Sequence, residues 1–188
     1  MPVALVDSLL SAIIRADGDA LVMHVGERPY VVAPSGQSQL ASRQLTLEAL
    51  KGMLNELLPV DARRALDELR AEHVKMALLT NKPLEASVRI LDALRLAEYF
   101  RMRVGGDGPW PRKPAPDGLW FLMKEESAGR ADTVLVGDST VDLQTARNAG
   151  VRICLARYGF GFANLPSDAL RGDELIVDRP SDVAGAVR

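Results

Sequence analysis

The chain has 188 residues, of which 47% are hydrophobic and 26% charged, and its formal net charge is −2. This is the balance of a globular protein with enough apolar material for a core, and it argues against general affinity for nucleic acid or for an anionic membrane surface. The single cysteine, Cys154, lies in an apolar run and cannot form an internal disulfide, which is typical of a reducing compartment.

The N-terminal part predicts a small α+β segment over residues 1–72. Residues 3–15 have the apolar spacing of an amphipathic helix, and they lack both the basic region of a secretory signal and the length of a membrane span, so we expect a cytoplasmic protein. Two short antiparallel strands are expected at 20–25 and 30–33, followed by a third at 34–37. Two helices then follow, at 46–58 and 61–73.

From residue 73 to residue 188 strand-like and helix-like segments alternate. The expected strands are 74–80, 101–106, 132–137, 151–156 and 174–179. The expected helices are 83–100, 116–127, 140–150 and 181–187. Repeated strand–helix units with apolar strands predict an α/β fold, in which a Rossmann-like parallel sheet is covered by helices on both faces.

In a parallel sheet, ligands bind beyond the carboxyl ends of the strands. Three loops of this kind carry suitable polar residues: Thr80, Asn81 and Lys82; Lys113; and Asp138, Ser139 and Asp142. Taken singly, each has a simpler explanation, because the hydroxyl and the carboxylates could cap helices and the lysine could lie on the surface. Together they favour a phosphate site, since carboxylates suit Mg²⁺ and a phosphoryl group needs several donors.

The order of three motifs, "LLTNKP", "KPAPDGL" and "VLVGDSTVDLQTARNAG", resembles the haloacid dehalogenase superfamily, in particular its phosphoglycolate-phosphatase-like branch. The words "LAEYF", "VGGD" and "YGFG" extend the resemblance over residues 74–188. It implies Mg²⁺-dependent hydrolysis of a small phosphate monoester, a phosphorylated metabolite, through an aspartyl-phosphate.

The resemblance also implies roles for the loop residues. Thr80 and Lys113 would be catalytic, the first bonding the transferring phosphoryl group and the second neutralising it. Asn81 and Ser139 would bind substrate. Asp138 would hold Mg²⁺, while Asp142 would support either the metal site or the lysine.

The sequence departs from this family at its opening motif. No Asp-x-Asp-Gly-Thr occurs in these residues and no cap segment is recognisable, and in the nearest match Arg15 falls at the position of the nucleophile. An arginine cannot attack phosphorus, so turnover requires another carboxylate, such as Asp7, Asp17 or Asp19, beside Asp138. We therefore expect weak Mg²⁺ binding, and three alternatives stay open: a phosphatase, an inactive phosphate- or partner-binding protein, and a fusion of two incomplete genes.

Residues 5–68 more loosely resemble the N-terminal domain of pilus-retraction and type II secretion ATPases. The nucleotide-binding motif G-x-x-x-x-G-K-[ST] is absent from the sequence, so this resemblance implies a partner-contacting segment without nucleotide hydrolysis. Unless 20–25 or 30–33 supplies the missing first strand, an edge of the parallel sheet lies open, and a homodimer or a partner strand is expected.

Overall fold

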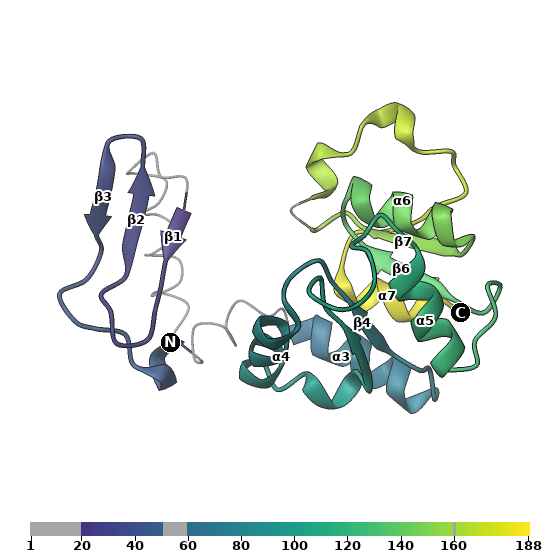
Figure 1. Cartoon of the computed structure of the whole chain (residues 1–188), viewed down its shortest axis with the longest axis horizontal. Coiled ribbons are helices and arrows are strands. Elements are labelled where there is room, and N and C mark those ends of the chain that lie inside the picture. The colour runs from purple at the N-terminus through teal and green to yellow at the C-terminus, as the bar shows by residue number, and fades with distance from the viewer. Residues whose placement is uncertain (1–19, 51–59, 160) are drawn as a thin grey trace. The chain divides into compact units, whose positions relative to one another are not determined.

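The computed structural model describes residues 20–50, 60–159 and 161–188 (Figure 1). The chain divides into two compact units, Met1–Leu58 and Pro59–Arg188. The sequence prediction placed the boundary after residue 72, whereas the structure places the helix α3 (Val60–Ala71) in the second unit. The reason is that α3 packs against segments near the C-terminus, a contact that no local pattern reveals.

The first unit contains an antiparallel sheet of three short strands. These are β1 (Ala20–Val22), β2 (Tyr30–Ala33) and β3 (Gly36–Gln39), in the order β1-β2-β3. Val31 and Ala33 of β2 are buried, and Leu45 is buried in the segment that follows the sheet. The strand expected at 20–25 is therefore confirmed over its first three residues, and the one expected at 30–33 is confirmed in full. The third strand, expected at 34–37, begins two residues later than predicted. The helix expected at 3–15 lies outside the described residues.

The second unit contains two groups of parallel strands. One pairs β4 (Ala77–Leu79) with β5 (Met102–Val104), and the other has the order β6-β7-β8, with bounds Val134–Gly137, Arg152–Ala156 and Leu175–Val177. The predicted α/β class with parallel strands is confirmed, and all five predicted strands of this part are present. The five strands do not form one continuous sheet, however. Among the described residues, no strand pairs with both β4 and β6, so the two groups stay separate.

Helices connect these strands and cover both faces of the β6-β7-β8 sheet. The helices are α4 (Leu84–Ala93), α5 (Asp117–Glu125), α6 (Thr140–Ala149) and α7 (Val183–Ala186). Short 3-10 turns lie at Ala97–Tyr99, Phe162–Asn164, Ser167–Ala169 and Pro180–Asp182. No helix among the described residues is long and apolar enough to cross a membrane.

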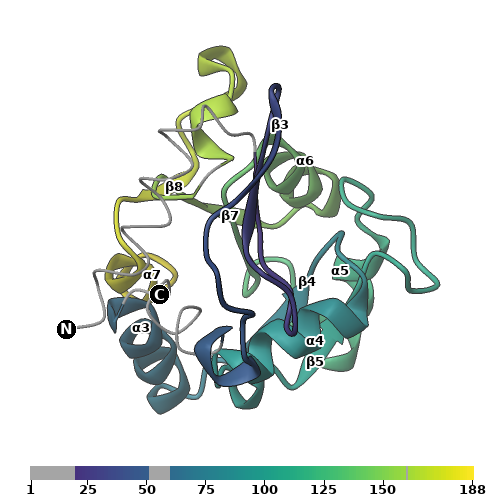
Figure 2. The ribbon, with the colours of Figure 1, turned by 90° about the vertical axis from the view of Figure 1, so that its left-hand side faces the viewer.

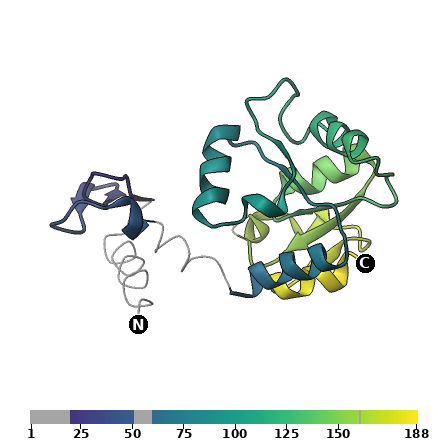
Figure 3. The ribbon, with the colours of Figure 1, turned by 90° about the horizontal axis from the view of Figure 1, so that it is seen from below.

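One face is covered by α5 and α6, which bury Leu119, Leu143 and Ala146 against Leu135 and Leu155 of the strands. The opposite face is covered by α7, where Cys154, Val177 and Val183 form a second cluster. The helix α3 lies beside α7, as Figure 2 and Figure 3 show from two directions. Ala65 and Leu69, four residues apart on α3, are buried.

Candidate functional site

The predicted site residues gather around one open cavity of about 410 Å³ at the carboxyl ends of β4 and β6. All six candidates line it: Thr80, Asn81, Lys113, Asp138, Ser139 and Asp142. The sequence predicted this convergence correctly, because the carboxyl ends of parallel strands meet at one edge of a sheet. Lys82 and Val141 also line the cavity, although the sequence analysis gave neither of them a role.

Asp142 is the most buried polar residue of the site, with 5% of its surface exposed. Its Oδ1 pairs with Lys113 Nζ at 2.6 Å. Its Oδ2 accepts hydrogen bonds from the Ser139 hydroxyl at 2.6 Å and from the backbone N–H groups of Asp138 and Ser139 at 3.2 and 3.1 Å. Both carboxylate oxygens are therefore engaged within the protein.

These contacts set the charge of Asp142. Burial raises the pKa of its carboxyl, but hydrogen bonds from Lys113 and Ser139 and the positive charge of Lys113 outweigh burial, so the pKa lies below its ordinary value. Asp142 is therefore ionised at neutral pH and forms a buried ion pair with Lys113, whose side chain is only 14% exposed.

Ser139 is the N-cap residue of the helix α6. Its Oγ accepts a hydrogen bond from Asp142 N at 3.3 Å, while the Asp142 side chain accepts from Ser139 N, which together make a capping box. Of the capping roles considered from the sequence, that of Asp142 is confirmed, whereas Thr80 does not cap α4, whose N-cap residue is Pro83. Ser139 and Asp142 also line the cavity. Helix capping and site geometry are therefore one arrangement.

Asn81 connects the β4 loop to the loop that carries Lys113. Its side-chain amide donates to Lys113 O at 2.9 Å, and its Oδ1 accepts from Lys113 N at 2.8 Å. This pair of bonds fixes the backbone of Lys113 beside the end of β4. The sequence analysis assigned Asn81 to substrate binding, and the structure adds a positioning contact that the sequence did not reveal.

Thr80 directly follows β4. Its backbone N–H donates to Val104 O at 3.0 Å, and its Oγ1 accepts from Lys82 N at 3.1 Å. A threonine hydroxyl can donate one hydrogen bond as well as accept, so its hydrogen is available to a ligand oxygen in the cavity.

Asp138 is the partly exposed carboxylate of the cavity. Its Oδ2 accepts from Gly161 N at 2.9 Å, and no hydrogen bond to Oδ1 is found among the described residues. A Cβ added at Gly159 would overlap the Asp138 side chain, so this glycine allows the loop after β7 to approach closely. The sequence signal for this loop was the word "YGFG", which the motif analysis quoted without assigning it a role.

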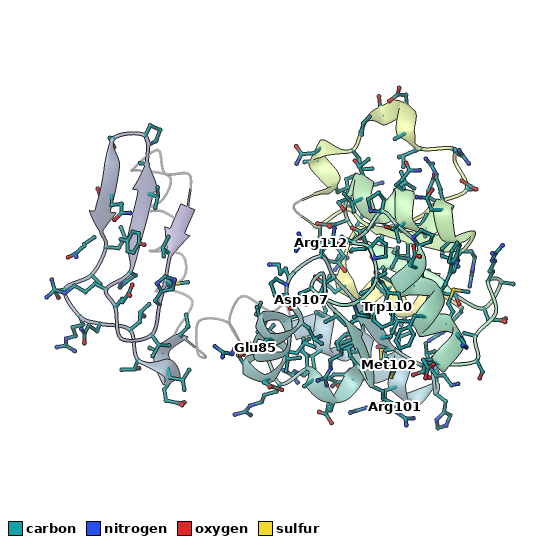
Figure 4. All side chains as sticks on the ribbon, in the orientation of Figure 1. Glu85, Arg101, Met102, Asp107, Trp110 and Arg112 are labelled. Carbon is teal, nitrogen blue, oxygen red and sulfur yellow. The ribbon has the colours of Figure 1, made fainter. Side chains whose placement is uncertain are left out.

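Two glycines of the loop after β5 lie close to the loop after β4 and to the start of α4. Cβ atoms added at Gly105 and Gly106 would overlap the backbone of Leu84 and of Asn81, respectively. Asp107, on the same loop, accepts a hydrogen bond from Leu84 N at 2.8 Å and so caps α4 from outside that helix (Figure 4). The loop after β5 therefore packs closely against the backbone of Asn81 and the start of α4.

The described residues fit a magnesium ion only in part. Asp138 offers a carboxylate oxygen, the hard ligand that Mg²⁺ prefers, and Mg²⁺ is commonly held by one or two carboxylates together with phosphate oxygens and water. Asp142 is committed to Lys113, and among residues 20–50, 60–159 and 161–188 no group of three or more His, Cys, Asp or Glu side chains could hold a metal. Asp7, Asp17 and Asp19, the alternative carboxylates, lie outside the described residues.

Comparison with known proteins gives a consistent result. The family model for haloacid dehalogenase-like hydrolases matches residues 41–156, which is more than half of the chain. Phosphoglycolate phosphatase from Pseudomonas fluorescens is 39% identical over 99 residues, covering 53% of this chain and 36% of its own. The plasmid phosphoglycolate phosphatase of Cupriavidus necator is 37% identical over 123 residues, covering 63% and 53%. The chain thus spans roughly a third to a half of the length of these relatives.

Solved structures show the same likeness. A candidate phosphoglycolate phosphatase from Lactobacillus delbrueckii has a TM-score of 0.61 and 28% identity, with 75% of this chain and 60% of that one covered. A haloacid dehalogenase superfamily hydrolase from Geobacter sulfurreducens has a TM-score of 0.58 at 22% identity, covering 72% and 64%, and shares the fold. The looser resemblance of residues 5–68 to secretion ATPases is not tested by these comparisons and stays a prediction.

Proposed function

The chain belongs to the haloacid dehalogenase-like hydrolase family, and on this premise we propose that its cavity binds the phosphoryl group of a small phosphate monoester and, with Mg²⁺, supports its hydrolysis. The observation that carries the proposal is the convergence of Thr80, Lys113 and Asp138 on one cavity. The phosphoglycolate phosphatases among its relatives make phosphoglycolate the first substrate to test.

In this proposal each residue has a role that follows from its contacts. The Thr80 hydroxyl donates to a phosphoryl oxygen, and the Lys113 ammonium, which has three donors, neutralises the phosphate charge while it stays paired with Asp142. Asp138 would hold Mg²⁺, which when bound adds positive charge at the phosphoryl oxygens. No residue of the described part of the chain is assigned as the attacking nucleophile.

Two of the sequence-based roles are refined in this proposal. Asp142, for which support of the metal or of the lysine was left open, acts on the lysine, because both of its oxygens are already occupied by protein donors. Asn81 acts first as a positioning residue for the Lys113 backbone. Ser139 orients Asp142 and remains at the cavity wall, where its contact with substrate stays a prediction.

A second candidate function is phosphate binding without turnover. It is favoured by the pairing of Asp142 with Lys113, which leaves Asp138 as the one carboxylate of the described cavity that is not paired with a lysine. Loss of the attacking group in a covalent mechanism costs several orders of magnitude in rate even when the binding groups remain. Binding of phosphate is therefore expected in both cases, and hydrolysis in only one.

One set of assays separates these functions. Hydrolysis of p-nitrophenyl phosphate and of phosphoglycolate is measured with excess Mg²⁺ and with EDTA, and binding of inorganic phosphate is measured by calorimetry. Asp138→Asn and Lys113→Met are the test variants, and Lys124→Met, an exposed lysine on α5, is the matched control. Turnover that needs Mg²⁺ and falls at least ~100-fold in both test variants supports the phosphatase.

Two other outcomes of these assays separate the binding protein from a wrong proposal. Phosphate binding that weakens in Lys113→Met, without turnover above that of Asp138→Asn, supports the binding protein. If wild-type protein neither binds phosphate nor hydrolyses either ester, the proposed function is wrong.

A further inference from the structure

Lys82 lies at the open side of the cavity as an exposed cation. Of the eight described residues that line the cavity, Lys82 and Val141 are exposed, and the other six are partly or fully buried. Val141 is apolar and 37% exposed. The open side of the described cavity therefore pairs a cation with an apolar side chain, and the roles assigned so far use neither of them.

Two hydrogen bonds hold the backbone of Lys82 beside the proposed phosphoryl site. Lys82 N donates to Thr80 Oγ1 at 3.1 Å, and Lys82 O accepts from Gly106 N at 2.8 Å. Gly106 packs so closely against this loop that a Cβ there would overlap Asn81 O. The root of the Lys82 side chain therefore has a fixed place relative to the Thr80 hydroxyl.

The two lysines of the cavity differ in their surroundings. The side chain of Lys113 is only 14% exposed, and its Nζ pairs with Asp142 at 2.6 Å. The ammonium of Lys82 is solvated and has no hydrogen-bond or ion-pair partner among residues 20–50, 60–159 and 161–188. Its three donors can therefore turn to a ligand without breaking a contact within the described part of the protein.

The depth of each lysine decides which part of a phosphate ester it can reach. In the proposed function the phosphoryl group lies at the inner wall, where Thr80 and the buried pair of Lys113 and Asp142 meet. The alcohol part of the ester then points to the open side, where Lys82 and Val141 lie. A short carbon link fits beside the apolar side chain, and an anionic group fits the ammonium.

The charges of the cavity favour a carboxylate as that anionic group. Lys113 and Asp142 balance each other, and Asp138 is the proposed Mg²⁺ ligand, so the charge of Lys82 is left for the rest of the ester. A single ammonium matches the single charge of a carboxylate, whereas a second phosphate would bring more charge and more oxygens than one lysine satisfies. An uncharged alcohol part would leave this cation unused.

We propose that Lys82 determines substrate selectivity by binding a carboxylate on the alcohol part of a short phosphate monoester. This inference rests on the proposed function, because it requires the phosphoryl group to lie at Thr80 and Lys113. Phosphoglycolate, which the names of the curated relatives contain, belongs to this class of ester. Lys82 is a binding residue in this scheme and takes no part in breaking the phosphate ester bond.

The test compares two esters that differ in this group. Phosphoglycolate has the carboxylate, and 2-hydroxyethyl phosphate has an uncharged hydroxyl in its place. Calorimetry with the full chain in EDTA, where Mg²⁺-dependent hydrolysis is prevented, should show phosphoglycolate binding at least ~10-fold more tightly. In Lys82→Met this preference should disappear, while the affinity for 2-hydroxyethyl phosphate stays within ~3-fold of the wild type.

Two further variants separate a specific contact from a general effect of charge. Lys124→Met removes an exposed lysine on α5 that does not line the cavity, and it should keep the full preference. Lys82→Arg should keep at least part of the preference, because a guanidinium also donates charge-assisted hydrogen bonds to a carboxylate. Circular dichroism confirms that all variants are folded.

The kinetic parameters give a second readout when Mg²⁺ is present. A group that binds substrate and transition state equally changes KM and leaves kcat unchanged. Lys82→Met should therefore raise the KM for phosphoglycolate about 10-fold or more at nearly constant kcat, whereas Lys113→Met should lower kcat. An equal fall in kcat on both esters in Lys82→Met would place Lys82 in the chemical step and overturn the selectivity role.

The remaining outcomes separate this inference from the proposed function. If wild-type protein binds both esters equally, or if Lys82→Met weakens both by the same factor, the selectivity role is wrong and the phosphate site stands. If neither ester nor inorganic phosphate binds, both proposals are wrong. If the preference depends on Lys82 but hydrolysis stays at background, the selectivity role holds and the phosphatase reading of the site is wrong.

Discussion

At the scale of single residues, Asp142 organises the site. It is buried, it pairs with Lys113, and it accepts three further hydrogen bonds, from the backbone N–H groups of Asp138 and Ser139 and from the Ser139 hydroxyl, which precede α6. A buried ion pair is maintained only when its remaining hydrogen-bonding capacity is satisfied, and here it is. Removal of Asp142 would leave Lys113 without its buried partner.

This arrangement makes the free energy of unfolding depend on pH in the acid range. The pKa of Asp142 is lowered in the folded protein, so its contribution is complete above the ordinary value of 3.8 and is lost as the pH falls through the lower folded-state pKa. Unfolding free energy, measured in urea between pH 6 and pH 2, should therefore fall below about pH 4. Asp142→Asn should cost about 2 kcal/mol near neutral pH and flatten this acid slope.

The matched control is Asp132→Asn, a change at an exposed carboxylate. Its acid slope should resemble that of the wild type. Equal slopes in wild type and Asp142→Asn would show that another group determines the acid sensitivity.

Gly159 provides a steric test of Asp138. Because a Cβ at this position would overlap the Asp138 side chain, Gly159→Ala should displace that carboxylate and destabilise the protein by roughly 1–3 kcal/mol. Gly185→Ala is the control, since its Cβ would meet nothing within 4 Å on α7. Urea unfolding and Mg²⁺-dependent hydrolysis should both decline in the first variant and not in the second, and equal behaviour of the two would contradict the steric reading.

At the scale of elements, the helix α6 combines capping with site geometry. Ser139 accepts from Asp142 N and donates to Asp142 Oδ2, so one side chain starts the helix and holds the buried carboxylate. The helix ends at Gly150, whose φ of 71° is the left-handed conformation that glycine adopts readily. The sequence predicted both ends of this helix, which was expected at 140–150.

We expect Ser139→Ala to cost about 1–2 kcal/mol of unfolding free energy, because an N-cap and a buried hydrogen bond are lost together. Thr140→Ala, at the exposed next position, should change stability by about 0.5 kcal/mol or less. Thermal and urea unfolding of both variants measure the difference. A Ser139→Ala variant as stable as Thr140→Ala would mean that the capping box contributes nothing.

At the scale of the whole molecule, the chain is two compact units, and the second has its own cores on both faces of a sheet. The helix α3 belongs to it, since it packs against α7 and the turn at Pro180–Asp182. Arg188, the last residue, also pairs with Glu72 just after α3. The second unit should therefore fold without the first.

Two fragments test this boundary. Residues 59–188 should unfold in one cooperative transition, with a free energy within about 1 kcal/mol of that of the same unit in the full chain. Residues 73–188, cut at the boundary expected from sequence, lose the buried Ala65 and Leu69 of α3 and should be less stable by roughly 2–5 kcal/mol. Circular dichroism in urea compares them, and equal stabilities would favour the later boundary.

The sequence by itself determined the alternating elements of the second unit and six of the eight residues that line its cavity. The strand Val134–Gly137 and the helix Thr140–Ala149 follow from local apolar patterns and caps, and the site follows because loops after parallel strands share one edge. These are local or topological properties, so they could be deduced without coordinates.

Only the tertiary structure decided what each of these side chains contacts. Three contacts join segments that are distant in sequence: Lys113 with Asp142, Asn81 with the Lys113 backbone, and Gly159 with Asp138. Such contacts cannot be predicted from the spacing of residues along the chain. The pairing of β4 with β5 and of β6 with β7 is of the same kind. A periodic pattern shows that a strand forms, but its neighbours depend on packing of the whole chain.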